Sequence, residues 1–213
     1  MEEQNIVIEI TDTEIRLLAG YVNNNKPHIC YVSSKSIKGL ISNGEIKDHS
    51  TLTSILLSMK NVTDQNGNKI LTTDDVTVIL PAIGLNIFQC EKTTKVVSVE
   101  SIISSVDIQN VISLIEKEPT PQGTEVIEIV PDQFILDNNR ISTVQPLGER
   151  SDEITLNAKV HTLPSRTVAE YKRVIENAHF TISRFCLNSY AACELGKYTQ
   201  GIPDNYILVF FNI

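Results

Sequence analysis

The chain has 213 residues, of which 41% are hydrophobic and 21% are charged, and its formal net charge is −8. This length is enough for one large domain or two small ones, and the negative charge without a lysine and arginine cluster argues against a nucleic-acid-binding surface. The N-terminus lacks the basic start of a signal peptide, and no stretch approaches the ~20 apolar residues of a membrane span. We therefore expect a cytoplasmic protein.

The N-terminal part predicts three strands of an antiparallel meander, at residues 5–10, 14–21 and 28–33. A helix follows, because four apolar residues recur at helical spacing: Leu52, Ile55, Leu56 and Met59. Asp48 or Ser50 is its expected cap. Residues 76–80 then form a short apolar strand that ends at a proline.

The middle of the chain predicts a small α/β module. Residues 86–99 are strand-like, and a helix follows whose apolar face consists of Ile108, Val111, Ile112 and Ile115. Ser104 or Ser105 is the expected cap of this helix. Two further strands, at 126–135 and 154–160, are expected to form the spine of the module, because the second alternates regularly between apolar and polar residues.

The C-terminal part predicts a helix, a strand, a short helix and a last strand. A capping box at residues 167–170 is expected to open the first helix, and residues 181–185 form the strand. Gly196 is placed to end the short helix at 189–195. The apolar run at 206–213 predicts a strand at which the sequence stops, so we expect a fragment of a longer protein.

Several stretches resemble, in order and spacing, the first half of FtsA, the actin-like bacterial cell-division protein. The opening hairpin of that family is similar to IVIEITDTEIRLLAG, and a following glycine-containing loop resembles SIKGLISNGEIKD. The entry to the family's inserted domain resembles DDVTVILPAIGLNI, and its central hairpin resembles IVPDQFILD with LNAKVHTL. The return to the first domain is similar to TVAEYKRVIENAHFTISRFCLNSYAACELG.

The resemblance implies an α/β fold with an insertion. Residues 1–85 and 162–205 would form the first actin-like, RNase H-like subdomain, and residues 86–161 an inserted small α/β domain of the SHS2 type. Residues 206–213 would begin a second lobe. The family's site for the FtsZ tail and its C-terminal membrane helix would lie outside this sequence.

The function that the resemblance implies is that of a scaffold. Such a protein links FtsZ filaments to the inner face of the cell membrane at the division site and self-associates. It recruits other division proteins through its inserted domain, here residues 86–161. Two alternatives stay open, namely an active ATPase or sugar kinase of the same superfamily, and a pilus-assembly protein of the PilM kind.

Five positions correspond to the family's nucleotide site: Glu9, Thr11, Asp12, Thr13 and Asn212. Glu9 takes the place of the acidic residue that holds a metal-bound water, and Asn212 that of an aspartate which opens the second phosphate loop. Thr11 replaces the usual glycine, and Asp12 replaces a threonine or serine. In the actin-like fold these loops cradle phosphates with backbone N–H groups.

Asp12 is the most consequential difference from the family's phosphate loop. A carboxylate about 4 Å from a phosphate charge is opposed by about 4 kcal/mol at an effective dielectric constant of about 20. A hydrogen bond to a charged group returns roughly 1.5–3 kcal/mol. We therefore expect weak binding of ATP and Mg²⁺ and still weaker hydrolysis, unless Asp12 turns away or binds magnesium. The plain alternative is a polar hairpin turn, in which aspartate is common.

The other candidate side chains predict no catalytic or metal site. His161 lies on the polar face of its strand beside Lys159, and a solvated histidine is the expected state. The four cysteines show no CxxC spacing, and in a reducing compartment we expect thiols that are mostly buried: Cys30, Cys90, Cys186 and Cys193.

Overall fold

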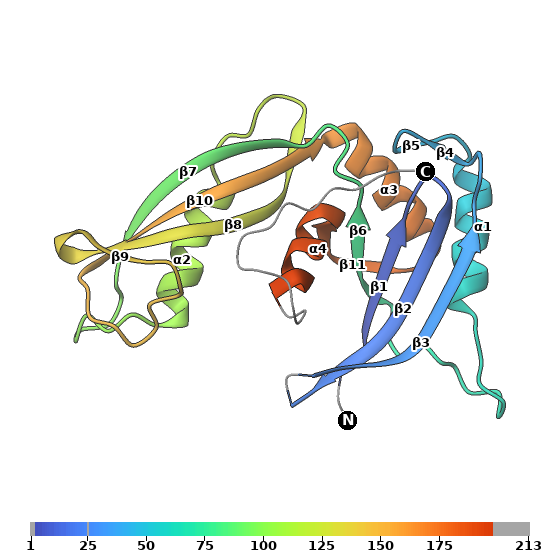
Figure 1. Ribbon diagram of the computed structural model, residues 1–213, viewed down its shortest axis with the longest axis horizontal. Helices are drawn as coiled ribbons and strands as arrows, with labels where there is room; N and C mark the ends of the chain where they lie inside the picture. The colour runs from blue at the N-terminus through green and yellow to red at the C-terminus, as the bar shows by residue number, and fades with distance from the viewer. Residues whose placement is uncertain (1–2, 25, 198–213) are drawn as a thin grey trace. The chain divides into compact units, whose positions relative to one another are not determined.

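The computed structural model describes residues 3–24 and 26–197. The chain divides into two compact units (Figure 1). The first unit comprises the residues up to Ile83 together with those from Arg166 onward, and the second unit is Gly84–Ser165. The predicted strand at 206–213 lies outside the described residues.

The first unit is built on a five-stranded sheet with the strand order β11-β6-β1-β2-β3. The three N-terminal strands form the predicted antiparallel meander: β1 (Asn5–Ile10), β2 (Glu14–Asn23) and β3 (Lys26–Ser36). On the other side of β1, β6 (Asp75–Leu80) pairs in parallel with it, and β11 (Thr181–Leu187) pairs in parallel with β6. The carboxyl ends of β1 and β6 therefore meet at one edge of the sheet.

One face of this sheet carries the core of the first unit. Its fully buried positions alternate along the strands, as a half-buried sheet requires: Ile6, Ile8, Ile10, Ile15, Leu17, Ala19, Val76, Val78 and Leu80. Helices α1 (His49–Lys60) and α3 (Ser165–Asn177) supply further buried residues, among them Leu52, Leu56, Val168 and Tyr171. Helix α4 (Asn188–Lys197) contacts β11 and β6.

Asp48 is the cap of α1. Its carboxylate accepts a hydrogen bond from the Thr51 N–H at 3.0 Å, as the sequence predicted for one of two candidates. Between the meander and this helix, β4 (Ile41–Ser42) and β5 (Glu45–Ile46) form a minimal hairpin. This hairpin becomes important for the candidate site.

The second unit is a four-stranded antiparallel sheet with the order β7-β10-β8-β9 and one helix. Its elements are β7 (Asn86–Lys95), α2 (Ser105–Glu116), β8 (Thr124–Leu136), a 3-10 turn (Asp137–Asn139), β9 (Arg140–Ser142) and β10 (Glu153–Pro164). The central strand β10 pairs with β7 and with β8. Residues at the entry and exit of the unit are direct partners, because Asn86 lies opposite Thr162.

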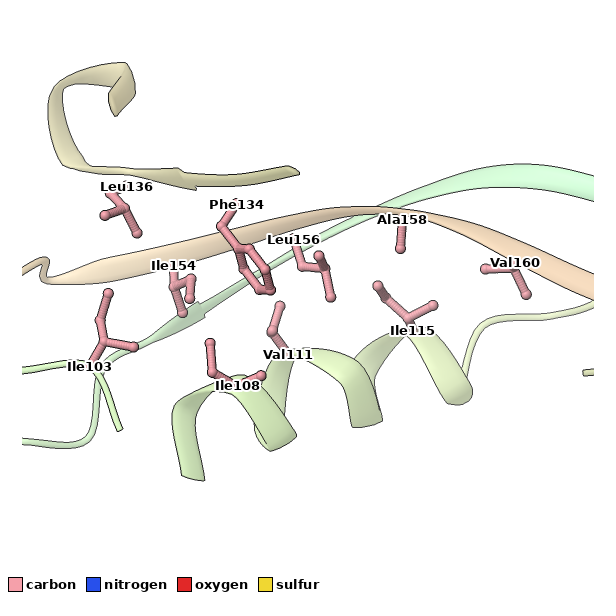
Figure 2. Packing of buried hydrophobic residues seen from close by; sticks show 10 residues of the cluster. All are labelled: Ile103, Ile108, Val111, Ile115, Phe134, Leu136, Ile154, Leu156, Ala158 and Val160. Carbon is pink, nitrogen blue, oxygen red and sulfur yellow. The ribbon is translucent and has the colours of Figure 1, made fainter. Parts of the chain in front are cut away.

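Helix α2 covers one face of this sheet. Figure 2 shows apolar side chains of the helix pointing at those of the strands, and all of the following are buried: Ile103, Ile108, Val111, Ile115, Phe134, Leu136, Ile154, Leu156, Ala158 and Val160. Burying one such side chain contributes about 1.5–3 kcal/mol. The alternation that the sequence showed along β10 is therefore the inner face of this core.

Three predicted element boundaries were wrong. Helix α3 begins at Ser165, directly after β10, so Thr167 lies inside the helix and cannot cap it, while Glu170 pairs with Arg166 at 3.1 Å. Gly196 lies within α4 and does not stop it. Strand β7 ends at Lys95, because the next two N–H groups donate to Asp152 and Asp107 in place of a strand partner.

Two predictions about individual side chains were also wrong. The His161 side chain is only 12% exposed, because Glu128 of β8 lies opposite it, and its Nδ1 is 3.8 Å from a Glu128 carboxylate oxygen. Burial, with the positive charge of Lys159, lowers the pKa of His161. Of the four cysteines only Cys186 is buried. None of the helices in the described part of the chain is long and apolar enough to cross a membrane.

Candidate functional site

The candidate site lies at the edge of the first sheet where β1 and β6 end. A small hollow there is lined by Glu9, Ile10, Thr11, Asp12, Ile79, Leu80, Pro81, Ile83 and Asn188. Carboxyl ends of parallel strands are a common place for ligands in α/β folds. The hollow has a volume of about 30 Å³, which is room for a water or two.

Thr11 forms hydrogen bonds within the turn between β1 and β2. Its Oγ1 accepts hydrogen bonds from the N–H of Glu14 at 3.1 Å and from the N–H of Thr13 at 3.3 Å. Its own N–H donates to the Glu14 carbonyl at 2.9 Å. Three backbone N–H groups of the turn are therefore already bonded within it, whereas a phosphate cradle needs free N–H groups.

Asp12 turns away from the turn and holds the β4–β5 hairpin. Its Oδ2 accepts the Asn43 N–H at 2.9 Å, and its Oδ1 accepts the Gly44 N–H at 3.1 Å. The two residues form the two-residue hairpin turn between Ser42 and Glu45, with φ angles of 50° and 73°, and Asn-Gly is the typical sequence for such a turn. We call this set of two hydrogen bonds the Asp12 clamp.

The two glutamates of the site share one arginine. Arg16 Nη1 lies 2.9 Å from Glu9, and Nη2 is paired with Glu14. The hydroxyl of Ser34 donates to Glu14 at 2.6 Å, and this bond, followed by the arginine, lowers the pKa of the Glu14 carboxyl. Glu9 therefore meets a guanidinium at the position where the resemblance implies a metal-bound water.

Tyr171 of α3 is a buried phenol whose pKa is influenced by the charge of Asp12. Its side chain is fully buried. Burial, with the negative charge of Asp12 as the second cause, raises the pKa of the Tyr171 phenol, so the hydroxyl stays protonated within electrostatic reach of the carboxylate. In the part of the chain that the structure describes, no group of three or more His, Cys, Asp and Glu side chains is arranged to hold a metal ion.

The structure thus brings together four of the five predicted site residues: Glu9, Thr11, Asp12 and Thr13. Asn212 lies outside the described residues. Sequence reasoning missed Arg16 and the role of the Asn43–Gly44 turn, although the Asn-Gly pair between two short apolar segments is a strong hairpin signal.

The arrangement does not fit a bound phosphate. Three N–H groups of the turn, those of Thr11, Thr13 and Glu14, are bonded within it. The Asp12 carboxylate, which points out of the turn, is bonded to another backbone segment. A phosphate in this position would have to displace these bonds and also approach the charge of Asp12. What the residues do instead is fasten the hairpin Ile41–Ile46 to the β1–β2 turn.

Comparison with known proteins supports the fold. Residues 85–162 match a family model described as the SHS2 domain inserted in FtsA. No curated protein sequence matches the chain significantly. The structure of a PilM–PilN type IV pilus biogenesis complex is similar at a TM-score of 0.53 and 14% identity, covering 93% of this chain and 49% of that one. The chain therefore spans about half the length of that structure.

Two more solved structures are similar at lower TM-scores. The cytoplasmic domain of EpsL, an inner-membrane component of the type II secretion system of Vibrio cholerae, has a TM-score of 0.34 and 12% identity, covering 87% of this chain and 57% of that one. A Bacteroides thetaiotaomicron protein with an actin-like ATPase fold has a TM-score of 0.37 and 8% identity, covering 94% and 58%. The predicted fold class is confirmed: the protein is a mixed α/β, actin-like subdomain that carries an SHS2 insert of the FtsA type.

Proposed function

We propose that this protein is an assembly scaffold of actin-like fold whose nucleotide site has been converted into a structural clamp. The observation that carries the proposal is the pair of hydrogen bonds from Asn43 and Gly44 to Asp12. A carboxylate that serves the fold in this way opposes a phosphate, and three N–H groups of the turn beside it are already hydrogen-bonded. The SHS2 unit then supplies a surface through which partners are recruited.

Calorimetry tests the loss of nucleotide binding. Mg-ATP is titrated into the full-length protein and into the Asp12→Thr variant, with Thr13→Ala as a control in the same turn. We expect no binding heat for the natural sequence or for the control, and measurable binding only where the carboxylate is removed. Micromolar binding by the natural sequence would show that the altered site still holds a nucleotide, and ATP turnover that Glu9→Ala abolishes would show an active ATPase site.

The partners that we propose are those of a cell-division scaffold. The FtsA type of the insert supports this choice. In this proposal the full-length protein joins FtsZ filaments to the inner face of the membrane, self-associates and recruits other division proteins through residues 86–161. A pull-down of FtsZ by the full-length protein, with and without ATP, is the direct test. We expect capture that does not depend on the nucleotide.

A pilus or secretion scaffold is the second candidate. The similarity to the PilM–PilN complex favours it, because the match extends over 93% of this chain. That complex belongs to type IV pilus biogenesis, and a scaffold of this class would bind the cytoplasmic tail of an inner-membrane partner. Capture of such a tail in place of FtsZ in the same pull-down would decide for this candidate.

A further inference from the structure

A groove in the second unit runs between the last turns of α2 and the first half of β8. It is lined by Ile112, Glu116, Val126, Ile127, Glu128 and Ile129. Ile112, Val126 and Ile129 pack partly against the core while they stay partly exposed. Most of the residues that line the groove are therefore apolar, and Glu116 adds an exposed carboxylate.

The wall formed by β8 carries an open strand edge. One edge of β8 pairs with β10 along its length, whereas on the other edge β9 pairs only with residues 134–136. No other strand in the described ranges takes up the part before Phe134. Unpaired N–H and C=O groups of such an edge are a template for an added strand.

The negative charge of the second unit favours a positively charged strand at this edge. The second unit contains twelve acidic and six basic residues, so it carries −6 of the chain's net −8. Glu116 at the groove and Glu125 beside it on β8 are exposed, and neither forms an ion pair with another described residue. A second copy of β8 would bring its own Glu125 and Glu128 to the same edge, and like charges on neighbouring strands are destabilising.

We propose that this groove binds an extended partner segment in which lysine or arginine alternates with apolar residues, and that the segment pairs with β8 as an additional strand. Successive side chains of a strand point to opposite faces. Ile129 lies opposite Val160 on the core face, whereas Glu128 lies opposite His161 on the other face. Apolar residues of the segment then contact Ile112 and Ile129, and its basic residues reach the exposed carboxylates of Glu116 and Glu125.

This inference rests on the proposed scaffold function and names the chemistry of one partner. The first test uses fluorescence anisotropy with the full-length protein and a fluorescein-labelled peptide of alternating lysine and valine. Three peptides serve as comparisons: lysine with serine, glutamate with valine, and lysine with valine methylated on alternate backbone nitrogens. We expect saturable binding of the first peptide and binding about tenfold or more weaker for each of the others.

Charge-reversal variants locate the site. Glu116→Lys with Glu125→Lys should weaken binding of the lysine–valine peptide about tenfold, since two attractions become repulsions. The matched control, Glu100→Lys with Glu153→Lys, changes two exposed glutamates elsewhere in the second unit by the same amount and should leave affinity nearly unchanged. Thermal melts of both variants verify that the fold is kept.

Three results would overturn the proposal. The peptide fails to bind, or both double variants weaken it equally, or the methylated or acidic peptide binds as well as the first. Any of these excludes a basic strand at the β8 edge. None of them bears on the titration of Mg-ATP, so failure of this inference is distinguishable from failure of the proposed loss of nucleotide binding.

Discussion

Removing the Asp12 carboxylate should loosen the β4–β5 hairpin. In the Asp12→Ala variant two backbone N–H groups lose their acceptor. The Asn43 N–H is exposed and regains water, so its loss costs about 0.5 kcal/mol, whereas the buried Gly44 N–H is harder to hydrate and its loss costs about 1.5 kcal/mol. We expect the free energy of unfolding to fall by about 2 kcal/mol.

Two measurements check this expectation. Urea denaturation compares the natural sequence with Asp12→Ala and with Thr13→Ala, which changes the neighbouring side chain but leaves both bonds of the Asp12 clamp in place. Hydrogen exchange then reports the amide of Gly44 directly, and it should lose protection in Asp12→Ala only. If both variants unfold at the same urea concentration and the Gly44 amide keeps its protection, the clamp does not hold the hairpin, and the reasoning fails.

Three further changes probe the turn, the core and a helix cap. Gly44→Ala should lower urea stability more than Gly39→Ala, by about 0.5–1 kcal/mol. Both positions have positive φ, but only the Cβ at position 44 meets another side chain, the terminal methyl of Ile83 at 2.7 Å, which has to move aside. Leu156→Ala should destabilise the second unit by about 2–5 kcal/mol, whereas the 51% exposed Leu147 should tolerate alanine. The pKa of Asp48 is lowered from 3.8 to about 2 by hydrogen bonds from the first turn of α1; a lowered folded-state pKa gives stability that is present above pH 3.8 and is lost as the pH falls toward 2. Melting temperatures of Asp48→Asn should therefore vary less over that interval than those of the natural sequence.

The elements that bury a single face could be predicted from the local periodicity of the sequence. The alternation from Ile154 to Val160 predicted β10, and the spacing of Ile108, Val111 and Ile115 predicted α2, because each pattern has a single inner side. Asp48 was predictable because a cap acts on its own helix. Thr167 was misread, because a capping-box pattern does not show that the preceding strand runs directly into the helix.

The candidate site could be predicted only in part, because it contains contacts between residues that are far apart in the sequence. The residues at the β1–β2 turn could be chosen from the sequence, and their departure from a phosphate loop could be weighed. The two residues that bind Asp12, Asn43 and Gly44, lie 31 and 32 residues away in the sequence. The direction of the Asp12 side chain could therefore not be predicted without the folded hairpin. The polar face of β10 was recognisable at His161, but its burial depended on β8 and on Glu128 being the opposite residue.

The pairing of Asn86 with Thr162 has a consequence for how the two units coexist in one chain. Opposite residues of antiparallel strands lie about 4.5–5.5 Å apart, so the second unit leaves the chain almost where it entered. The β7–β10 ladder holds the two ends of the inserted segment together. Once this ladder has formed, the length of the insert therefore adds little to the entropy cost of closing the connection within the first unit. Such a junction permits the insert to be exchanged for another module, or for a short turn, without changing the path of the host.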